Sequence, residues 1–212
     1  MLYHAAIELT QGFDMPVYRL DGITPVVHPD AHVDTTAVLI GDVIIGPDCY
    51  IGPNASLRGD FGRITVSAGA NVQDTCVLHT FPGKDCIVER DGHIGHGAVL
   101  HGCQIGVNVM VGMNAVLMDD VVIGESSIIA AAAFVAAGFS CPPRSLVMGI
   151  PAKIKRQLSE QEVSWKSQAT REYQQLTQRC NTTLAETEAL SEPEPDRRRM
   201  QVSDFEFKSD KH

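Results

Sequence analysis

Aliphatic residues recur at every sixth position along much of the chain, a spacing that fits neither an α-helix nor an alternating strand. A six-residue unit makes one short strand and one corner. Three units close a triangular turn of about 18 residues, and successive turns stack through parallel hydrogen bonds. The pattern therefore predicts an all-β coil of hexapeptide repeats over residues 15–150. The recurring aliphatic residues are Leu39, Ile45, Ile51, Leu57, Ile105, Val111, Leu117, Ile123, Ile129 and Val135.

Small residues accompany these aliphatic positions. Glycine directly follows several of them, as at Gly46 and Gly52, where we expect the backbone to bend with an unusual φ. Alanine at Ala55, Ala115 and Ala133 is expected to keep the corners uncrowded.

Two segments interrupt the repeat. They are GDFGRITVSAGA, around residues 59–70, and TFPGKDCIVERDG, at residues 80–92. We expect loops that project from the rigid coil, which is where specificity is usually found.

Beyond Pro151 the pattern becomes helical. Ser159 and Glu162 have the spacing of a capping box, and a helix is predicted at about 159–187. It would form the core of a C-terminal helical segment, residues 151–190, packed against the coil or against a neighbouring subunit. The Pro-rich, charged residues 191–212 are expected to form a loosely held tail.

Composition and charge limit the classes of function. The chain has 212 residues, a formal net charge of −9 and a pI near 5.3, which argues against nucleic-acid binding. Residues 1–14 are expected to form a flexible N-terminal extension without signal-peptide features, and no apolar run is long enough to span a membrane. The six cysteines form no CxxC pair, so a cytoplasmic protein with reduced thiols is expected.

Three histidines have the ligand count of a catalytic metal site. His79 and His101 are 22 residues apart, which is one coil plus a few residues, so they are predicted to share a face in adjacent turns. His96 lies about one face away and is predicted to serve a neighbouring subunit. A cyclic homotrimer would then hold three metal sites at its interfaces. The expected ion is Zn²⁺, or Fe²⁺ or Co²⁺, and the alternative is that the three histidines are corner or interface residues without metal. His93 lies outside the spacing and is not assigned to the site.

Polar residues near the histidines are predicted to support the site. Arg58 and Asp60 share a strand face and are expected to form an interface ion pair. Asn71 and Gln73 share another face and are candidate catalytic residues that orient a metal-bound water. Asp74 points the other way and is expected to make an interface contact.

Several motifs carry a resemblance to a known family. LIGDVIIGPDCYIGPNASLRGDFGRI, NVQDTCVLH, GHIGHGAVLHGC and VGMNAVLMDD resemble γ-class carbonic anhydrase-like hexapeptide proteins. GIPAKIKRQLSEQEVSWKSQATREYQ is similar to the PaaY-type phenylacetic acid degradation branch and to the closely related CaiE branch of carnitine metabolism. The resemblance implies a left-handed β-helix, a homotrimer and a C-terminal α-helix. It also implies that His79, His96 and His101 bind the metal, with His96 from the adjacent subunit, and it supports the roles given above to the polar residues.

One position departs from the efficient carbonic anhydrases of this family. Phe61 stands where they carry a glutamate, and the loop after His79 shows no proton-shuttling glutamate. Vigorous CO2 hydration is therefore not expected, and Phe61 is predicted to line an apolar substrate pocket.

The resemblance favours a metal-dependent hydrolase of acyl-CoA thioesters in phenylacetate degradation. The alternatives are a γ-class carbonic anhydrase with weak CO2 hydration, a noncatalytic trimeric accessory protein of carnitine metabolism, and a hexapeptide acyltransferase.

Overall fold

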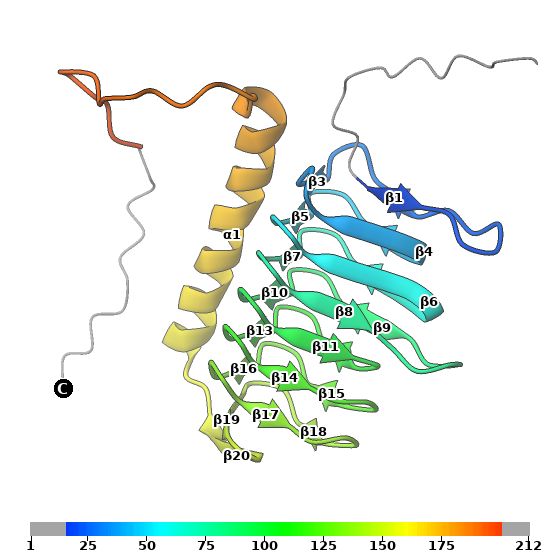
Figure 1. The fold of residues 1–212 in the computed structure, drawn as a ribbon. Coiled ribbons are helices and arrows are strands. Elements are labelled where there is room, and N and C mark those ends of the chain that lie inside the picture. The colour runs from blue at the N-terminus through cyan, green and yellow to red at the C-terminus, as the bar shows by residue number, and fades with distance from the viewer. Residues whose placement is uncertain (1–15, 201–212) are drawn as a thin grey trace, which may run out of the picture.

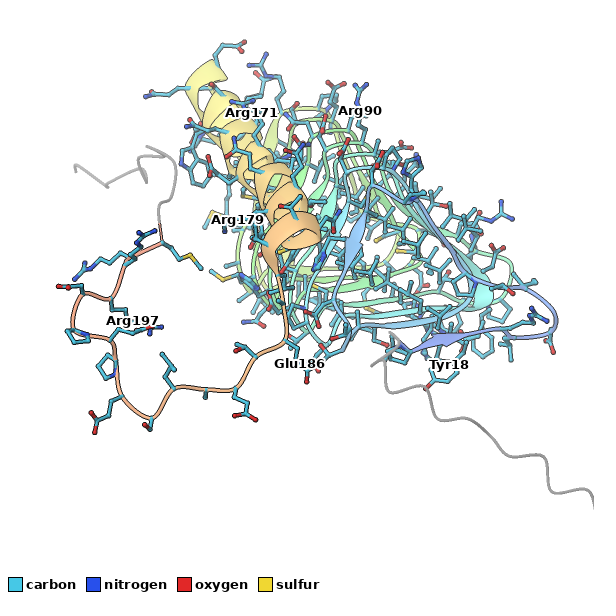
Figure 2. The ribbon with its side chains drawn as sticks, turned by 90° about the horizontal axis from the view of Figure 1, so that it is seen from above. Tyr18, Arg90, Arg171, Arg179, Glu186 and Arg197 are labelled. Carbon is cyan, nitrogen blue, oxygen red and sulfur yellow. The ribbon has the colours of Figure 1, made fainter. Side chains whose placement is uncertain are left out.

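The computed structural model describes residues 16–200, and nearly all of its strands belong to one stack of triangular coils (Figure 1). The expected extension at 1–14 and the last residues of the tail lie outside the described residues. Viewed down the stack, the coils form a triangle with the helix α1 outside one side (Figure 2). The three sides are called face one, face two and face three below.

Face one and face two form one continuous sheet because two long strands turn the corner between them. Those strands are β4 (Val38–Ile45) and β6 (Ser56–Val66). Face one also contains β1 (Val17–Tyr18), β8 (Val77–His79), β11 (Val99–His101), β14 (Val116–Leu117) and β17 (Phe134–Val135). Face two also contains β2 (Val26–Val27), β9 (Cys86–Val88), β12 (Gln104–Ile105), β15 (Val122–Ile123) and β18 (Ser140–Cys141).

Face three is a separate sheet that ends in an antiparallel hairpin. Its parallel strands are β3 (His32–Val33), β5 (Tyr50–Ile51), β7 (Asn71–Val72), β10 (His93–Ile94), β13 (Met110–Val111), β16 (Ile128–Ile129) and β19 (Ser145–Gly149), and β20 (Ala152–Gln157) closes the stack.

The interior of the coil confirms the six-residue pattern. All ten recurring aliphatic side chains are at most 1% exposed. The residue two positions earlier also points inward and is often small, as at Ala55 and Ala115. Cys49, Cys76 and Cys103 fill this same small position, and the cysteines of the described residues are free thiols. Burial raises the pKa of the Cys76 thiol to about 11, so this side chain acts as a small apolar core residue.

The glycines after the aliphatic residues have a different role from the one expected. They do not adopt positive φ. Instead, a Cβ added at Gly112 would lie 2.4 Å from the backbone nitrogen of Ala131 in the next coil. The positive φ falls two residues later, at Asp48 (55°), Asn54 (58°) and Asn114 (57°), residue types that tolerate the left-handed conformation. Glycine is therefore required by close stacking of the coils, and the corner residue bends the chain.

The two interruptions are also shorter than expected. Residues 59–66 do not form a projecting loop, because β6 continues through them around the corner. In the second segment only residues 80–85 leave the coil, and Cys86 begins β9. The first segment is accommodated within β6, whose pairing with β4 shifts register at the corner, and the second leaves the coil only as the short loop at 80–85.

The helix α1 (Glu160–Thr183) packs on face three and runs along the stack (Figure 1). Ser159 and Glu162 form the predicted capping box, and the helix ends at Thr183, four residues before the expected end. The following segment, with Glu186 and Arg197, extends away from the coil (Figure 2). Across residues 16–200, no helix has the length and apolar character needed to cross a membrane.

Candidate metal centre

His79 and His101 lie side by side at the ends of β8 and β11. They are direct partners in the parallel register of face one, one coil apart. Nδ1 of His79 is 3.2 Å from Nε2 of His101. This confirms the expectation that the two residues share a face in adjacent turns.

Each of these two imidazoles has a carboxylate on its other ring nitrogen. Nε2 of His79 is 2.8 Å from Oδ1 of Asp60, and Nδ1 of His101 is 2.8 Å from Oδ1 of Asp119. An ionised carboxylate only accepts hydrogen bonds, so it favours the tautomer with the proton on the nitrogen beside it. The two nitrogens that face each other then both carry lone pairs, an arrangement that a shared proton or a metal ion would stabilise.

Asp60 connects this pair to the surface. Its Oδ2 accepts a hydrogen bond from Arg58 at 3.0 Å while its Oδ1 holds His79. The expected ion pair of Arg58 and Asp60 therefore forms within one chain, and its contribution to an interface remains a prediction. Asp119 was not predicted by the sequence analysis. Its signal is a spacing of 18 residues after His101, which is one coil.

His96 occupies the opposite corner of face one, between β10 and β11. Its Nδ1 is 2.7 Å from Oδ2 of Asp74, and its side chain is 47% exposed. His96 does not join the pair formed by His79 and His101. Within the described part of a single chain, no group of three His, Cys, Asp or Glu side chains is arranged to hold a metal ion. Within one chain His96 is therefore separated from His79 and His101, and a metal site completed by a neighbouring subunit stays a prediction.

Asn71 and Gln73 lie on face three beneath α1, away from the pair. Nε2 of Gln73 donates to Oδ1 of Asn71 at 3.0 Å and lies 2.9 Å from Nε2 of His93. Oε1 of Gln73 accepts from the backbone N–H of His96 at 3.2 Å. Gln73 is therefore tied to His96, and a site that includes His96 would also have Gln73 close to it.

His93, which the spacing left aside, is the centre of this buried cluster. It is 8% exposed, and Tyr173 of α1 packs edge-on to its ring at 5.3 Å. Burial lowers the pKa of His93 to about 3, helped by the nearby charges of Lys166 and His96. His93 is consequently neutral at physiological pH and serves as a hydrogen-bonded core residue.

Comparison with known proteins is consistent with this architecture. A family model described as bacterial transferase hexapeptide (six repeats) matches residues 24–59 and 102–137. The carnitine operon protein CaiE of Proteus sp. (strain LE138) is 55% identical over 186 residues, covering 88% of this chain and 94% of the relative. CaiE of Escherichia coli (strain K12 / DH10B) is 54% identical over 187 residues, covering 88% of this chain and 95% of the relative.

The chain belongs to the CaiE family.

A solved structure also matches the CaiE-family coil. It is a hexapeptide transferase family protein from Anaplasma phagocytophilum, 34% identical with a TM-score of 0.75, covering 77% of this chain and 97% of that one. The predicted left-handed parallel β-helix with a C-terminal helix is confirmed. Both of these relatives are named CaiE, and neither is named PaaY. Of the two branches that the sequence resembles, the comparison therefore supports CaiE.

Two phenylalanines flank the histidine pair of this CaiE-family chain. The ring of Phe61 lies 5.4 Å from that of His79, and the ring of Phe81 lies 5.0 Å from that of His101. Both are more than half exposed. Phe81 was not predicted, although it lies in the loop directly after His79-Thr80. The two rings make the surface beside the pair apolar.

Proposed function

We propose that this chain is a metal-dependent hydrolase of acyl-CoA thioesters and works as a homotrimer. One observation carries the proposal. His79, His96 and His101 each have a carboxylate on one ring nitrogen, which leaves the other nitrogen available as a ligand. Carboxylate–histidine pairs of this kind are typical of metal sites, where they fix the tautomer and raise the basicity of the ligand.

A trimer accounts for the separation of the two half-sites. His96 and the pair lie at opposite corners of face one, so a cyclic arrangement can place His96 of one protomer beside the pair of the next. Face one also presents an apolar row that suits burial against a neighbour. In register across its strands this row is Val77, Val99, Val116 and Phe134, of which Val77 and Phe134 are over a third exposed.

The three imidazoles would hold Zn²⁺, Fe²⁺ or Co²⁺, since imidazole accepts all three. A bound ion of this kind lowers the pKa of water toward about 7 and polarises a carbonyl group. Asp60, Asp119 and Asp74 keep the ring nitrogens correctly protonated. Phe61 and Phe81 provide apolar walls that exclude bulk water near the reacting carbonyl.

Hydrolysis of a thioester requires no reactant besides water. The oxygen of water forms a bond to the thioester carbon, the C–S bond breaks, and the sulfur leaves as the CoA thiolate. The proton from water passes to the thiolate, and a carboxylic acid is released. Oε1 of Gln73 accepts from the backbone N–H of His96 and keeps a second lone pair, which can orient the attacking water.

Two metabolic pathways are candidates for the proposed reaction. Sequence resemblance to PaaY-type proteins supports aryl thioesters of phenylacetate breakdown. The names of the relatives, carnitine operon proteins, support a role in carnitine metabolism, either as this hydrolase or as a noncatalytic accessory protein. CO2 hydration would use the same histidines but would not benefit from the exposed rings of Phe61 and Phe81.

A panel of substrates separates these functions. The purified protein is assayed for metal content, for hydrolysis of aryl, straight-chain and trimethylammonio acyl-CoA thioesters, and for CO2 hydration. We expect about one ion per chain and metal-dependent thioester hydrolysis. Hydration of CO2 without thioester hydrolysis would favour the anhydrase, and absence of both metal and turnover would favour the accessory protein.

Complementation tests the shared site directly. His96→Ala and His101→Ala are each expected to be inactive alone. When both are co-expressed, random cyclic trimers should regain about a quarter of wild-type activity, because one interface in each mixed trimer combines an intact pair with an intact His96. Recovery of no activity from verified mixed trimers would contradict the shared site.

A further inference from the structure

An apolar groove of about 660 Å³ separates α1 from face three, a volume within the usual range of small-ligand sites. Its floor is formed by side chains of β13 and β16, including Met110 and Ile128. One wall is made by the corners of three successive coils, and the other by α1. The α1 residues that line it are Trp165, Ala169, Glu172 and Tyr173.

The groove is continuous with the predicted half-site at His96. Gly95, His96 and Gln73 line it, and Met113 and Ala131 extend the same wall along the next two coils. A molecule whose reacting carbonyl lies at His96 can therefore extend its acyl part into the groove. The acyl part would run between the coil corners and α1.

The charges of the residues that line the groove indicate which acyl groups it can bind. Glu172 is the one carboxylate among the lining residues, and no lysine or arginine is present there. The titratable lining residues besides Glu172 and Tyr173 are His93 and His96, whose ring nitrogens contact Gln73 and Asp74 respectively.

The opposite flank of α1 carries both signs of charge, because Asp91 and Glu125 lie there with two arginines. Arg171, the neighbour of Glu172 in the sequence, lies there together with Arg90 (Figure 2). Arginine thus lines the pocket on this flank of α1 but not the groove.

A carboxylate beside aromatic residues in an otherwise apolar site matches a large, weakly hydrated cation. A quaternary ammonium group is attracted by aromatic rings and by a carboxylate, and its methyl groups suit apolar walls. Trp165, Tyr173 and Glu172 provide these elements on one side, and Met110 and Ile128 provide apolar surface on the other.

We infer that the groove between α1 and face three binds the acyl part of a CoA thioester that ends in a quaternary ammonium group. This inference rests on the proposed thioester hydrolysis at the shared metal site. It assigns Glu172, Trp165 and Tyr173 as specificity-determining residues. The phosphates of CoA remain outside the groove, which offers them no lysine or arginine.

Fluorescence provides a direct test because Trp165 is the single tryptophan of the chain. The His101→Ala variant, which would leave the thioester intact, is titrated with 4-(trimethylammonio)butanoyl-CoA. A parallel titration uses 5,5-dimethylhexanoyl-CoA, in which carbon replaces the nitrogen. We expect both to change the Trp165 emission, with the cationic thioester binding about tenfold more tightly.

Variants assign the preference to the groove. Glu172→Gln should reduce the tenfold preference to about twofold, whereas Glu188→Gln, the same charge change on an exposed residue after α1, should retain it. Equal affinities for the two thioesters in the His101→Ala protein would overturn the inference. So would emission that neither thioester changes.

The outcome is separable from that of the proposed function. If neither thioester affects Trp165 while wild-type protein still hydrolyses thioesters in a metal-dependent manner, only the groove assignment fails. If the cationic thioester binds in the groove but wild-type protein with bound metal hydrolyses no thioester, only the proposed hydrolysis fails.

Discussion

Histidines occupy two contrasting regions of this coil. His79 and His101 lie at an open corner of face one, each paired with a carboxylate and flanked by an exposed phenylalanine ring. His93 lies beneath α1 on face three, and its ring nitrogens contact the amides of Asn71 and Gln73. The first region, called the open region below, is partly accessible. The second, called the closed region, is largely covered by α1, and His93 is 8% exposed there.

The contrast shows that the partner of an imidazole indicates its role. A carboxylate fixes the tautomer and makes the opposite nitrogen a better ligand. Amide partners in a buried cluster instead stabilise a neutral ring, and burial lowers the pKa of His93 to about 3. The open region is therefore suited to bind a metal ion, and the hydrogen bonds of the closed region to join α1 to the coil.

Removal of a histidine from each region should give opposite phenotypes, and this is the largest effect we expect. His101→Ala should lose bound metal and hydrolysis to below detection. His93→Gln should keep metal in about one ion per chain but lose about 1–3 kcal/mol of unfolding free energy, because buried hydrogen bonds are disturbed. Metal analysis and urea denaturation measure the two properties. If His93→Gln lost its metal but kept the wild-type unfolding free energy, the two regions would not differ in role as proposed.

A carboxylate introduced beside His93 would make the closed region resemble the open one. Asn71 is 1% exposed, so Asn71→Asp buries a charge and should lower the unfolding free energy by on the order of 3 kcal/mol at pH 7. Burial raises the pKa of the new carboxyl, so the loss should shrink at acidic pH, where the group is protonated.

Asp74→Asn provides the comparison for this change at an exposed corner. Asp74 is 40% exposed, and we expect an effect below about 1 kcal/mol. The unfolding free energies of Asn71→Asp and Asp74→Asn are measured by urea denaturation between pH 4 and about 8. Equal losses in the two variants would show that a charge beside His93 is tolerated as well as a change at an exposed corner.

Removal of a carboxylate from the open region should weaken metal binding without loss of the fold. Asp119→Asn replaces the charged acceptor of the His101 ring by a neutral amide and should reduce metal affinity about 10- to 100-fold. The neighbouring variant Asp120→Asn breaks only the surface ion pair with Lys84, so its affinity should match wild type. Competition with a chelator measures both. An unchanged affinity in Asp119→Asn would show that Asp119 does not support a metal ligand.

The six-residue period was sufficient to predict the coil, the adjacency of His79 and His101, and the separation of His96. These follow because the repeat fixes where each residue falls along a coil. The capping box likewise placed the start of α1. The period did not reveal that Asn71 and Gln73 turn toward α1, because docking of the helix depends on contacts between segments far apart in sequence. Phe81 was missed because it lies in the loop that leaves the repeat.

A further expected effect concerns a lysine in the closed region. Lys166 of α1 is 1% exposed, and its Nζ donates to the backbone oxygen of Asp91 at 2.6 Å and to Oδ1 of Asn108 at 2.8 Å. Burial lowers its pKa from 10.5 to about 7, against the opposing effect of Asp91. Between these two pH values the unfolded chain holds a proton that the folded chain has released.

The sign of the pH dependence follows from this difference in bound protons. Stability rises with pH wherever the unfolded state binds more protons, so Lys166 should add stability as pH increases from about 7 towards 10.5, by at most about 1.4 kcal/mol per pH unit. Lys166→Met keeps the length of the side chain and should remove this slope, whereas Lys155→Met, at an exposed position on β20, should keep it. Urea denaturation at a series of pH values measures the difference from wild type. Parallel curves for wild type and Lys166→Met would mean that the amine remains solvated, and that face three beneath α1 is as open to water as the corner of His79 and His101.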